Sequence, residues 1–414
     1  MCSATGFGSS HLKDYVDRLE PTLQDQDRNH ESFAGIPVKL LLWSPGGAGH
    51  GYHGPGAAAA RVYRLLAREK GFNCDLAHAV AAHSQNAIFR EMHYVGDLGS
   101  TPLGRTAFLL RANRWIARHS ADYDVVHGLS AYLHTMIPCL AFEKKNVPTV
   151  IKITNANTNL SVKPGLNRLL GLSKFRQRKI SQISGFIAIS QDICEELMTF
   201  GVPAEKIHFI PNGVDCIHFT PADQSQKETL RRELGIPNRP TVVFVGALAR
   251  RKCPHLVVEA VCRMEDTQLL LVGPEDDSEY CLELKRIVAQ AGADDRIFFA
   301  GFHRDTRRFV MCSDIFCLPS KNEGLSNAML ESAACGVTPI CTAVSGARDL
   351  IRHGETGFFV EPSQESIYAM LVSLMESPTQ LASVGRNARK KIVSDYSLEN
   401  VAALHQRLFS SLVY

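Results

Sequence analysis

Short apolar runs alternate with longer stretches of helical spacing along most of the chain. In the first half, the apolar runs fall at 38–43, 124–128, 147–153 and 185–190, and residues 57–71 repeat apolar positions at the period of a helix. The runs have the length of buried strands, and the longer stretch has the length of a surface helix. Strands separated by helices predict parallel sheets built from βαβ units.

The alternation stops once and then restarts. It stops at 206–221, where Pro and Gly interrupt the pattern, and a polar stretch follows as far as Pro240. Six further apolar runs come next, at 241–248, 267–273, 296–301, 314–320, 337–341 and 356–362. Three helical patterns then close the chain, at 364–376, 379–394 and 398–413. The predicted fold class is therefore α/β, with two doubly wound, Rossmann-like domains that face each other across a cleft.

Chain length also favours two domains, because 414 residues exceed the roughly 250 to 300 residues at which a single hydrophobic core stops growing. We predict a loosely ordered N-terminal extension at 1–35 and a first domain at 36–211. The second domain is predicted at 212–395, and residues 396–414 are predicted to form a C-terminal helix that packs back toward the first domain.

Composition places the chain among ordinary globular proteins. Apolar residues make up 45% of it and charged residues 21%. There is no run of about 18 apolar residues and no signal-peptide pattern at the N-terminus, so we predict a cytoplasmic location. The twelve cysteines include no CxxC pair, which indicates reduced thiols rather than disulfides or a zinc site.

Charge is distributed unevenly between the predicted domains. The net charge is +8 over residues 36–215, −3 over 1–35 and −2 over 216–414. The basic residues of the first domain concentrate at 103–120 and 166–181, and both stretches also carry apolar residues at near-helical spacing. A solvated helix face, an anionic acceptor and peripheral contact with a membrane are all open as explanations. We predict no nucleic-acid partner, because no basic motif interleaved with aromatic residues accompanies the charge.

A glycine-rich segment follows the first predicted strand. It contains a G-x-G-x-x-G pattern that ends at Gly54, but about a dozen residues separate the strand from the next helix. A dinucleotide-binding fingerprint needs a tighter turn, so we interpret Gly54 and Gly56 as part of a flexible loop that faces the cleft, with a plain loop as the alternative. His50 and His53 lie in this segment, but no cysteine or carboxylate is near them to complete a metal site, and no metal site is predicted.

The second half contains the more specific arrangement. Arg250, Arg251 and Lys252 follow the predicted strand at 241–248 directly, at the position where parallel sheets bind ligands. Three cations at this place suit a diphosphate. This segment therefore predicts one side of a phosphate site.

A second segment, after the predicted strand at 314–320, supplies the other side. A helix is predicted from Leu325 to Ala334, and its first N–H groups and partial positive charge favour an anion. The predicted phosphate-binding residues are Gly324, Leu325, Ser326 and Asn327.

Two glutamates bracket this helix start. Glu323 lies just ahead of the helix, and Glu331 lies about two turns along it. We predict that Glu323 points past the phosphate and that Glu331 lies beside the groove at a distance suited to a ribose, whose two hydroxyls a carboxylate can accept. The alternative is a pair of exposed glutamates on an ordinary helix.

These residues resemble glycosyltransferase family four, the "group 1", glycogen-synthase-like family of retaining GT-B glycosyltransferases. The resemblance covers about residues 36–410. The resemblance rests on the motifs IPNGVDCIHFTP (210–221), VGALARRKCPH (245–255), IFFAGF (297–302) and the long block LPSKNEGLSNAMLESAACGVTPICTAVSGARDLIRHGETGFFVEP (318–362). The fold that the resemblance implies is GT-B, with an acceptor-binding first domain and a second domain that binds a nucleotide-sugar donor.

The resemblance also implies roles for individual residues. Glu331 would bind the ribose of the donor and Glu323 the transferred sugar, while Lys252 would contact the diphosphate and Phe302 would frame the base. Lys252 and Glu323 are therefore the predicted catalytic residues. The sugar would pass to a hydroxyl acceptor, for which lipid-linked and anionic compounds are both open, with retention of the anomeric configuration and without a metal or other cofactor.

The chain departs from the family pattern in the second domain. The family usually has Arg directly after the glycine of the strand at 241–248, where this chain has Ala247. Arg250 or Arg251 would then supply the positive charge that the family arginine provides.

A second departure lies in the first domain. The family usually has a His near the sugar, and this chain has Thr154 and Asn155 at that place. His127 is a substitute candidate, with a hydrogen-bonded strand-end histidine as the alternative.

Other activities of the same fold stay open. A nucleotide-sugar epimerase would act without an acceptor, and a catalytically degenerate protein would bind the donor without turning it over. A glycan phosphorylase would need a lysine for pyridoxal phosphate, which is not evident. The sequence identifies neither the base and sugar of the donor nor the acceptor.

Overall fold

The computed structural model describes residues 37–48, 54–80, 87–155 and 179–414. The predicted N-terminal extension, part of the glycine-rich segment and most of the basic stretch at 166–181 lie outside these residues. Within the described ranges, no helix is long and apolar enough to cross a membrane, and every cysteine is a free thiol.

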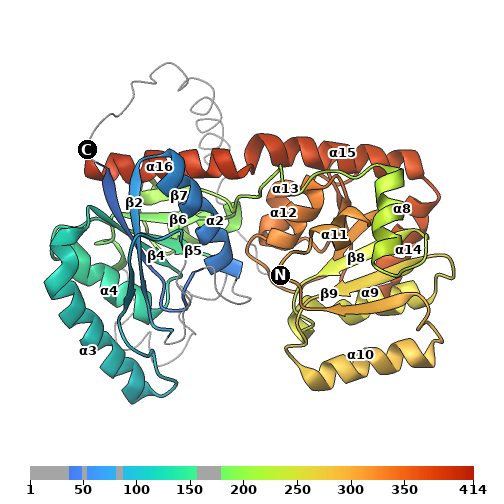
Figure 1. Cartoon of the computed structure of the whole chain (residues 1–414), viewed down its shortest axis with the longest axis horizontal. Helices are drawn as coiled ribbons and strands as arrows, with labels where there is room; N and C mark the ends of the chain where they lie inside the picture. Colours follow the sequence, from blue (N-terminus) through green and yellow to red (C-terminus); the bar gives the residue numbers. More distant parts are fainter. Residues whose placement is uncertain (1–36, 49–53, 81–86, 156–178) are drawn as a thin grey trace, which may run out of the picture. The chain divides into compact units, whose positions relative to one another are not determined.

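The first half of the chain forms a seven-stranded parallel sheet with the strand order β3-β2-β1-β4-β5-β6-β7 (Figure 1). The strands are β1 (Val38–Trp43), β2 (Phe72–His78), β3 (Met92–Tyr94), β4 (Val125–Leu129), β5 (Thr149–Ile153), β6 (Gly185–Ala188) and β7 (Ile207–Phe209). The four strands predicted in this half are confirmed as β1, β4, β5 and β6. The sequence pattern missed β2, β3 and β7.

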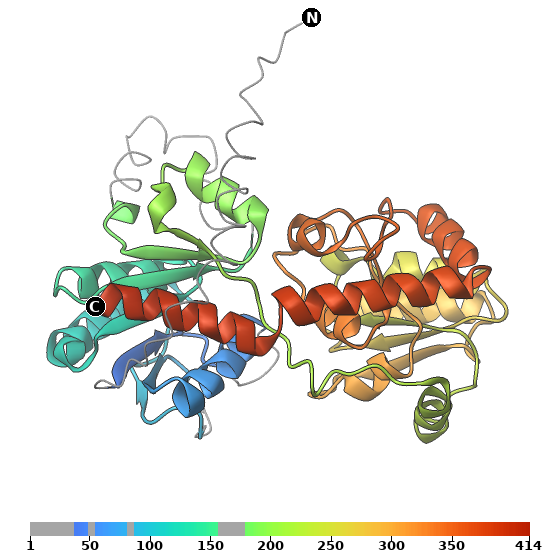
Figure 2. The ribbon, with the colours of Figure 1, turned by 90° about the horizontal axis from the view of Figure 1, so that it is seen from above.

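Helices cover both faces of this sheet, and the alternation along β1 shows how. Leu40 and Leu42 face a core built with α2 (Gly54–Glu69) and α16 (Leu398–Val413), whereas Leu41 and Trp43 face α3 (Pro102–His119) and α4 (Leu133–Glu143). Both views show α16 beside α2, against which it packs (Figures 1 and 2). A strand that is buried on both faces reads as a continuous apolar run, which is why the pattern of β1 was readable. Among the residues of this half that the structure describes, α7 (Gln191–Thr199) is a further helix.

The second half of the chain forms a six-stranded parallel sheet with the order β10-β9-β8-β11-β12-β13. The strands are β8 (Thr241–Val245), β9 (Gln268–Val272), β10 (Ile297–Gly301), β11 (Ile315–Leu318), β12 (Thr338–Cys341) and β13 (Phe358–Phe359). All six predicted strands of this half are confirmed. Every residue of β8, β9, β11 and β12 is buried, as expected for the centre of a parallel sheet.

Eight helices of the described chain accompany the second sheet. They are α8 (Gln224–Glu233), α9 (Pro254–Cys262), α10 (Ser278–Gln290), α11 (Arg307–Met311), α12 (Asn327–Ala334), α13 (Ser345–Leu350), α14 (Gln364–Met375) and α15 (Pro378–Asp395). α9 packs against α10 and α14, and α12 packs against α15 (Figure 1). The closing helices that the sequence predicted correspond to α14, α15 and α16.

The chain passes between the two sheets twice, and the two connections pair with each other. Val214 donates its N–H to the Tyr396 carbonyl at 2.9 Å, and Leu398 donates to the Val214 carbonyl at 3.0 Å. Gly213 permits this approach, because a Cβ added there would lie 3.0 to 3.2 Å from atoms of Leu398 and Val401. The second connection leads into α16, whose residues complete the core of the first sheet.

Candidate functional site

The second sheet has its topological switch point between β8 and β11. These strands are neighbours, although β9 and β10 separate them in the sequence. The chain leaves β8 to build one side of the sheet and later leaves β11 to build the other, and ligands of α/β sheets bind at such a point, beyond the carboxyl ends of the strands. The predicted donor residues other than Phe302 and Glu331 occupy this place, because a short 3-10 turn at Arg250–Lys252 follows β8 and the segment from Ser320 to Asn327 follows β11. The Lys321 N–H joins the two segments by donating to the Arg251 carbonyl at 2.9 Å.

The two predicted catalytic residues contact each other at this point. Lys252 Nζ lies 2.6 Å from Glu323 Oε1. The same carboxylate oxygen accepts a hydrogen bond from Ser320 Oγ at 3.2 Å and lies 3.3 Å from Arg251 Nη1. Lys252 is buried and Glu323 is half-buried, so water screens the attraction between their charges little.

Gly246 determines where the Lys252 side chain can lie. It follows β8, and a Cβ added to it would lie 3.1 to 3.3 Å from Cδ, Cε and Nζ of Lys252. The lysine therefore extends directly over the Gly246 backbone, whose φ of 152° favours glycine. A side chain at this position would crowd the Lys252 side chain, which would have to shift.

The two arginines beside Lys252 differ in their contacts. Arg250 pairs with Glu283 on α10 at 2.8 Å and stacks over the Tyr280 ring at 4.7 Å from its centre. Arg251 is the arginine that reaches Glu323. Arg250 and Arg251 are the two residues that could replace the arginine missing at Ala247. Of these, Arg251 is the one that lies beside the predicted catalytic residues.

The helix predicted from Leu325 starts at Asn327, two residues later than the sequence prediction. Ser326 is its N-cap, and its hydroxyl accepts the Met329 N–H at 3.3 Å. The Leu325 carbonyl accepts a hydrogen bond from the Asn212 amide at 3.3 Å, which holds the segment ahead of the helix in place. The predicted phosphate-binding residues therefore form the cap and entry of α12.

Gly324 lies in close contact with the first half of the chain. A Cβ added to Gly324 would lie 2.1 Å from the Thr154 carbonyl oxygen and 3.2 Å from Ile189 Cδ1. Only glycine fits at this distance. The structure thus places the predicted phosphate residue Gly324 against the predicted sugar-site residue Thr154, and the exposed Asn155 follows directly.

Glu331 lies on α12 and is paired from both sides. Its Oε1 atom lies 3.0 Å from Arg61 Nη1 of α2, and its Oε2 atom accepts a hydrogen bond from Thr306 Oγ1 at 3.4 Å. Burial raises the pKa of the Glu331 carboxyl, and the Arg61 guanidinium counteracts that effect. The alternative of an exposed glutamate is therefore excluded for Glu331, whose side chain is 13% exposed.

Sequence reasoning missed both partners of Glu331. Thr306 lies in the loop between β10 and α11, four residues after the predicted base-framing residue Phe302, so one loop carries Phe302 and a contact to Glu331. Arg61 is 270 positions from Glu331 in the sequence. No local pattern links residues so far apart.

His127 lies in the core of the first sheet. Its Nδ1 atom is 3.1 Å from the Tyr63 hydroxyl, and its ring packs near His405 and Phe409 of α16. Burial holds the pKa of His127 well below its usual value, and the charges of His405 and Lys152 lower it further. The structure thus places His127 as a core histidine, the alternative that the sequence left open.

The predicted glycine-rich loop is shorter than expected. α2 starts at Gly54, so Gly54 and Gly56 form its first turn instead of a flexible loop. Close packing explains the difference, because a Cβ added to Gly56 would lie 2.9 Å from the Gly47 carbonyl oxygen. Glycine therefore serves here to bring the helix against the turn that follows β1.

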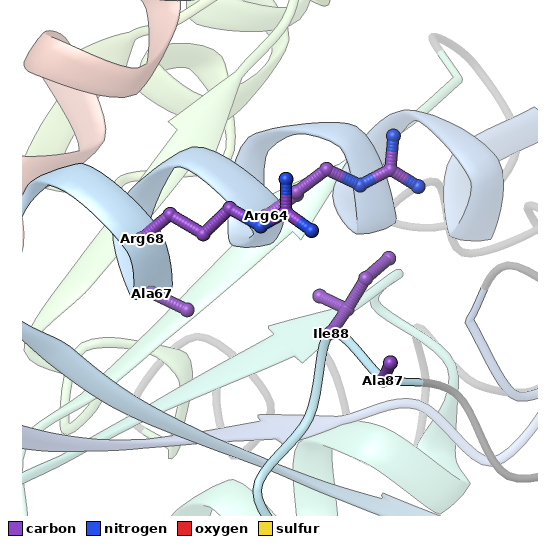
Figure 3. Close-up of a pocket in the computed structure, with 5 residues that line it drawn as sticks. All are labelled: Arg64, Ala67, Arg68, Ala87 and Ile88. Atoms are coloured by element: carbon purple, nitrogen blue, oxygen red, sulfur yellow. The ribbon is translucent and has the colours of Figure 1, made fainter.

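A hollow of about 220 Å³ lies beside α2, lined by Arg64, Ala67, Arg68, Ala87 and Ile88 (Figure 3). Its two arginines are one helical turn apart on α2. None of the predicted donor residues lines this hollow, so we do not assign the donor to it.

One group of potential metal ligands occurs within the described residues. Asp75, Glu91 and His93 have ligand atoms within 4.8 Å of one another. Asp75 is already paired with Arg90 at 2.6 Å and accepts a hydrogen bond from Tyr123 at 3.2 Å. The group belongs to the segments of β2 and β3 in the first sheet and contains no predicted donor residue.

Two family models match the chain, one in each half. The model "Glycosyl transferases group 1" matches residues 226–391, and "Glycosyltransferase Family 4" matches residues 79–217. The first match includes Lys252, Glu323 and Glu331. The resemblance that the sequence motifs indicated is therefore confirmed.

Relatives and solved structures agree with this assignment. The chain is 28% identical to a D-inositol 3-phosphate glycosyltransferase of Xylanimonas cellulosilytica over 71% of each chain. It is 26% identical to an N-acetyl-alpha-D-glucosaminyl L-malate synthase of Bacillus anthracis, over 69% of this chain and 72% of the relative.

Among solved structures, a glycosyltransferase of Rickettsia africae superposes with a TM-score of 0.76 over 92% of this chain and 99% of that one, at 17% identity. Anabaena HepE, solved with UDP and glucose, superposes with a TM-score of 0.72 over 90% of this chain and 100% of that one, at 18% identity. These likenesses establish the GT-B fold. The chain therefore belongs to the group 1 glycosyltransferases of family four and is a sugar-transferring enzyme.

Proposed function

We propose that the enzyme transfers a sugar from a nucleotide-diphosphate sugar to a hydroxyl acceptor, with retention of the anomeric configuration and without a metal. The observation that carries the proposal is the contact between Lys252 and Glu323 next to the N-cap of α12, at the switch point of the second sheet. A cation and the free N–H groups of a helix start suit a diphosphate, and a carboxylate beside them suits sugar hydroxyls.

The chemistry follows from these groups. The bond between the anomeric carbon and the diphosphate oxygen breaks, and a bond from the acceptor oxygen to the same face of that carbon forms. The acceptor proton passes to an oxygen of the departing diphosphate. Negative charge therefore develops on the diphosphate, where Lys252 and the start of α12 stabilise it without reorganisation. No residue of the protein has to act as a nucleophile.

Product analysis tests this proposal. With a donor, an acceptor and an excess of EDTA, we expect full activity and a product whose anomeric configuration in a proton NMR spectrum equals that of the donor. An inverted product, or activity that EDTA abolishes and Mg²⁺ restores, would contradict the proposal. Epimerised sugar nucleotide without any acceptor product would identify the epimerase alternative, and absence of all turnover would identify a degenerate binder.

The acceptor is proposed to be anionic. The predicted first domain carries the positive charge of the chain, with +8 over residues 36–215. Two relatives have names that contain anionic compounds, inositol 3-phosphate and L-malate. The positive charge of this domain would attract an anionic acceptor and favour its binding over that of a neutral one.

Peripheral membrane contact, and with it a lipid-linked acceptor, is also proposed, because α3 carries exposed arginines and both α3 and α4 carry exposed apolar residues. α3 contains four arginines and no acidic residue, and Leu103 at its start is 82% exposed. Leu133 at the start of α4, which packs against α3, is 65% exposed. The remaining large apolar residues exposed on these two helices and at the α4 N-cap are Leu110, Tyr132 and Ile137. Apolar side chains flanked by arginines suit the surface of an anionic membrane.

Vesicle binding tests this surface. The wild type is expected to bind vesicles of phosphatidylcholine with phosphatidylglycerol and to bind pure phosphatidylcholine weakly, as measured by co-sedimentation. The double change Leu103→Glu and Leu133→Glu should weaken binding by about tenfold or more, since each leucine loses its apolar burial and adds a repelled charge. Ile217→Glu is the matched control, because Ile217 is 85% exposed and lies outside α3 and α4. Equal binding to both vesicle types, or equal loss in the control, would contradict the proposal.

A further inference from the structure

Arg61 is the residue of the first half of the chain that contacts the predicted ribose-binding carboxylate. It lies on the second turn of α2, and its Nη1 atom is 3.0 Å from Glu331 Oε1. The side chains of Arg61 and Glu331 are only 22% and 13% exposed. Water screens an ion pair in this position little. Removing Arg61 would therefore destabilise the charged form of the Glu331 carboxylate.

The other charged groups around Glu331 do not replace Arg61. Asp305, just before the Thr306 contact, is a second carboxylate and raises the pKa of Glu331 further. His218 and Arg307 lie beside Asp305, at 3.2 and 3.9 Å, and so face that carboxylate. Arg389 of α15 donates to the Ala334 carbonyl at the other end of α12.

The two oxygens of Glu331 show what the arrangement can do. Oε1 faces Arg61 and Oε2 faces Thr306, so the carboxylate plane is fixed by one contact on each side. Each carboxylate oxygen can accept a second hydrogen bond. A pair of adjacent sugar hydroxyls can therefore bind to Glu331 while Arg61 stays in place.

We propose that Arg61 is a positioning residue for the donor, which keeps the Glu331 carboxylate charged and oriented for the ribose hydroxyls. This inference rests on the proposed function, since it takes Glu331 to be the ribose-binding residue. It adds that the nucleotide site of the second sheet is completed by a helix of the first.

The test compares nucleotide affinity in four variants. UDP, GDP and ADP are screened against the wild type by thermal shift, and the nucleotide with the largest shift is titrated by calorimetry between pH 6 and pH 8. Arg61→Met removes the charge and keeps the length of the side chain, and Arg61→Lys keeps the charge. Arg64→Met is the matched control, because Arg64 lies one turn further along α2, is exposed and has no carboxylate partner in the described part of the chain. Glu331→Gln tests the carboxylate itself.

The expected result depends on pH in one variant alone. Without the Arg61 charge, the pKa of Glu331 rises further, so a larger fraction of the carboxyl is protonated as the pH falls. In Arg61→Met the dissociation constant should therefore exceed the wild-type value by a factor that grows as the pH falls, and the difference from wild type should be smallest at pH 8. Arg61→Lys should stay within about threefold of wild type, and Arg64→Met should not differ from it.

Each outcome decides something. If Glu331→Gln binds the nucleotide like wild type, the ribose role of Glu331 is wrong and the donor site of the proposed function fails with it. If Glu331→Gln binds weakly and Arg61→Met binds like wild type at every pH, only the role of Arg61 is wrong. A loss in Arg61→Met that is the same at every pH, and that Arg61→Lys shares, would show a purely structural role and would also overturn the inference. If Arg61→Met does not fold, Arg61→Gln takes its place.

Discussion

Replacing Lys252 with alanine is expected to lower kcat for sugar transfer by about 10²- to 10³-fold, the usual cost of removing one preorganised group that stabilises developing charge. The ammonium group lies beside Glu323 and the start of α12, where the leaving diphosphate is proposed to bind. Because this charge grows as the bond breaks, the effect should fall on kcat more than on nucleotide affinity. Initial rates with saturating donor, together with the dissociation constant of the nucleotide, separate the two quantities.

The variant should still fold. Without Lys252, the Glu323 carboxylate keeps Ser320 at 3.2 Å and Arg251 at 3.3 Å, so it is not left without a partner. Lys321→Ala is the matched control, because Lys321 is an exposed lysine of the segment after β11 that is not among the predicted donor residues. An exposed surface charge contributes little, so we expect less than about a threefold change in kcat. A Lys252→Ala enzyme with near wild-type kcat would refute the catalytic role of the lysine.

Replacing Glu331 with alanine is expected to raise the dissociation constant of the nucleotide by about 100-fold. Two hydroxyls of the ribose would each lose a hydrogen bond to a charged acceptor, and each such bond is worth about tenfold or more in affinity. Isothermal titration calorimetry with the nucleoside diphosphate alone measures this effect without any contribution from turnover. The melting temperature of the variant shows whether the fold survives, since Arg61 loses its partner in the same change.

Glu323→Gln is the contrasting variant for this measurement. Glu323 lies on the other side of the helix start, beside Lys252, and is proposed to hold the transferred sugar. It should leave nucleotide affinity within about threefold of wild type and lower kcat instead. If Glu323→Gln and Glu331→Ala weaken nucleotide affinity to the same extent, or lower kcat to the same extent, the two carboxylates do not have the separate roles proposed for them.

The strands were predictable where both faces of a strand are buried. β8 is an unbroken run of buried residues, β1 is interrupted by the exposed Lys39 alone, and the sequence placed β1 at its observed ends. β2 was missed because Asn73 and Asp75 interrupt its apolar pattern. Asp75 is fully buried there, since Arg90 pairs with it. A polar residue that is paired inside the protein cannot be distinguished from a surface residue by periodicity.

The candidate site was predictable as two separate segments, and their contacts were not. Glycine, basic residues and a helix start follow β8 and β11 in the sequence, and a parallel sheet brings such segments to one edge. The pairing of Lys252 with Glu323 and of Arg61 with Glu331 depends on the path of the chain between residues 71 and 270 positions apart. His127 shows the opposite case. The sequence placed it at the end of a strand, where a histidine is a functional candidate, whereas in the structure it lies within β4 and contacts residues of α2 and α16.

The central claim is that the carboxyl edge of the second sheet binds the donor nucleotide through Glu331 and the start of α12. A thermal-shift screen of UDP, GDP, ADP and their sugars tests it most directly, because a ligand that binds only the folded state raises the melting temperature by mass action. We predict that one nucleotide stabilises the wild type clearly and that the same concentration of this nucleotide stabilises Glu331→Ala much less, because its dissociation constant is expected to be about 100-fold higher. A wild type that no nucleotide stabilises, or a Glu331→Ala variant that is stabilised as much as the wild type, would contradict the claim.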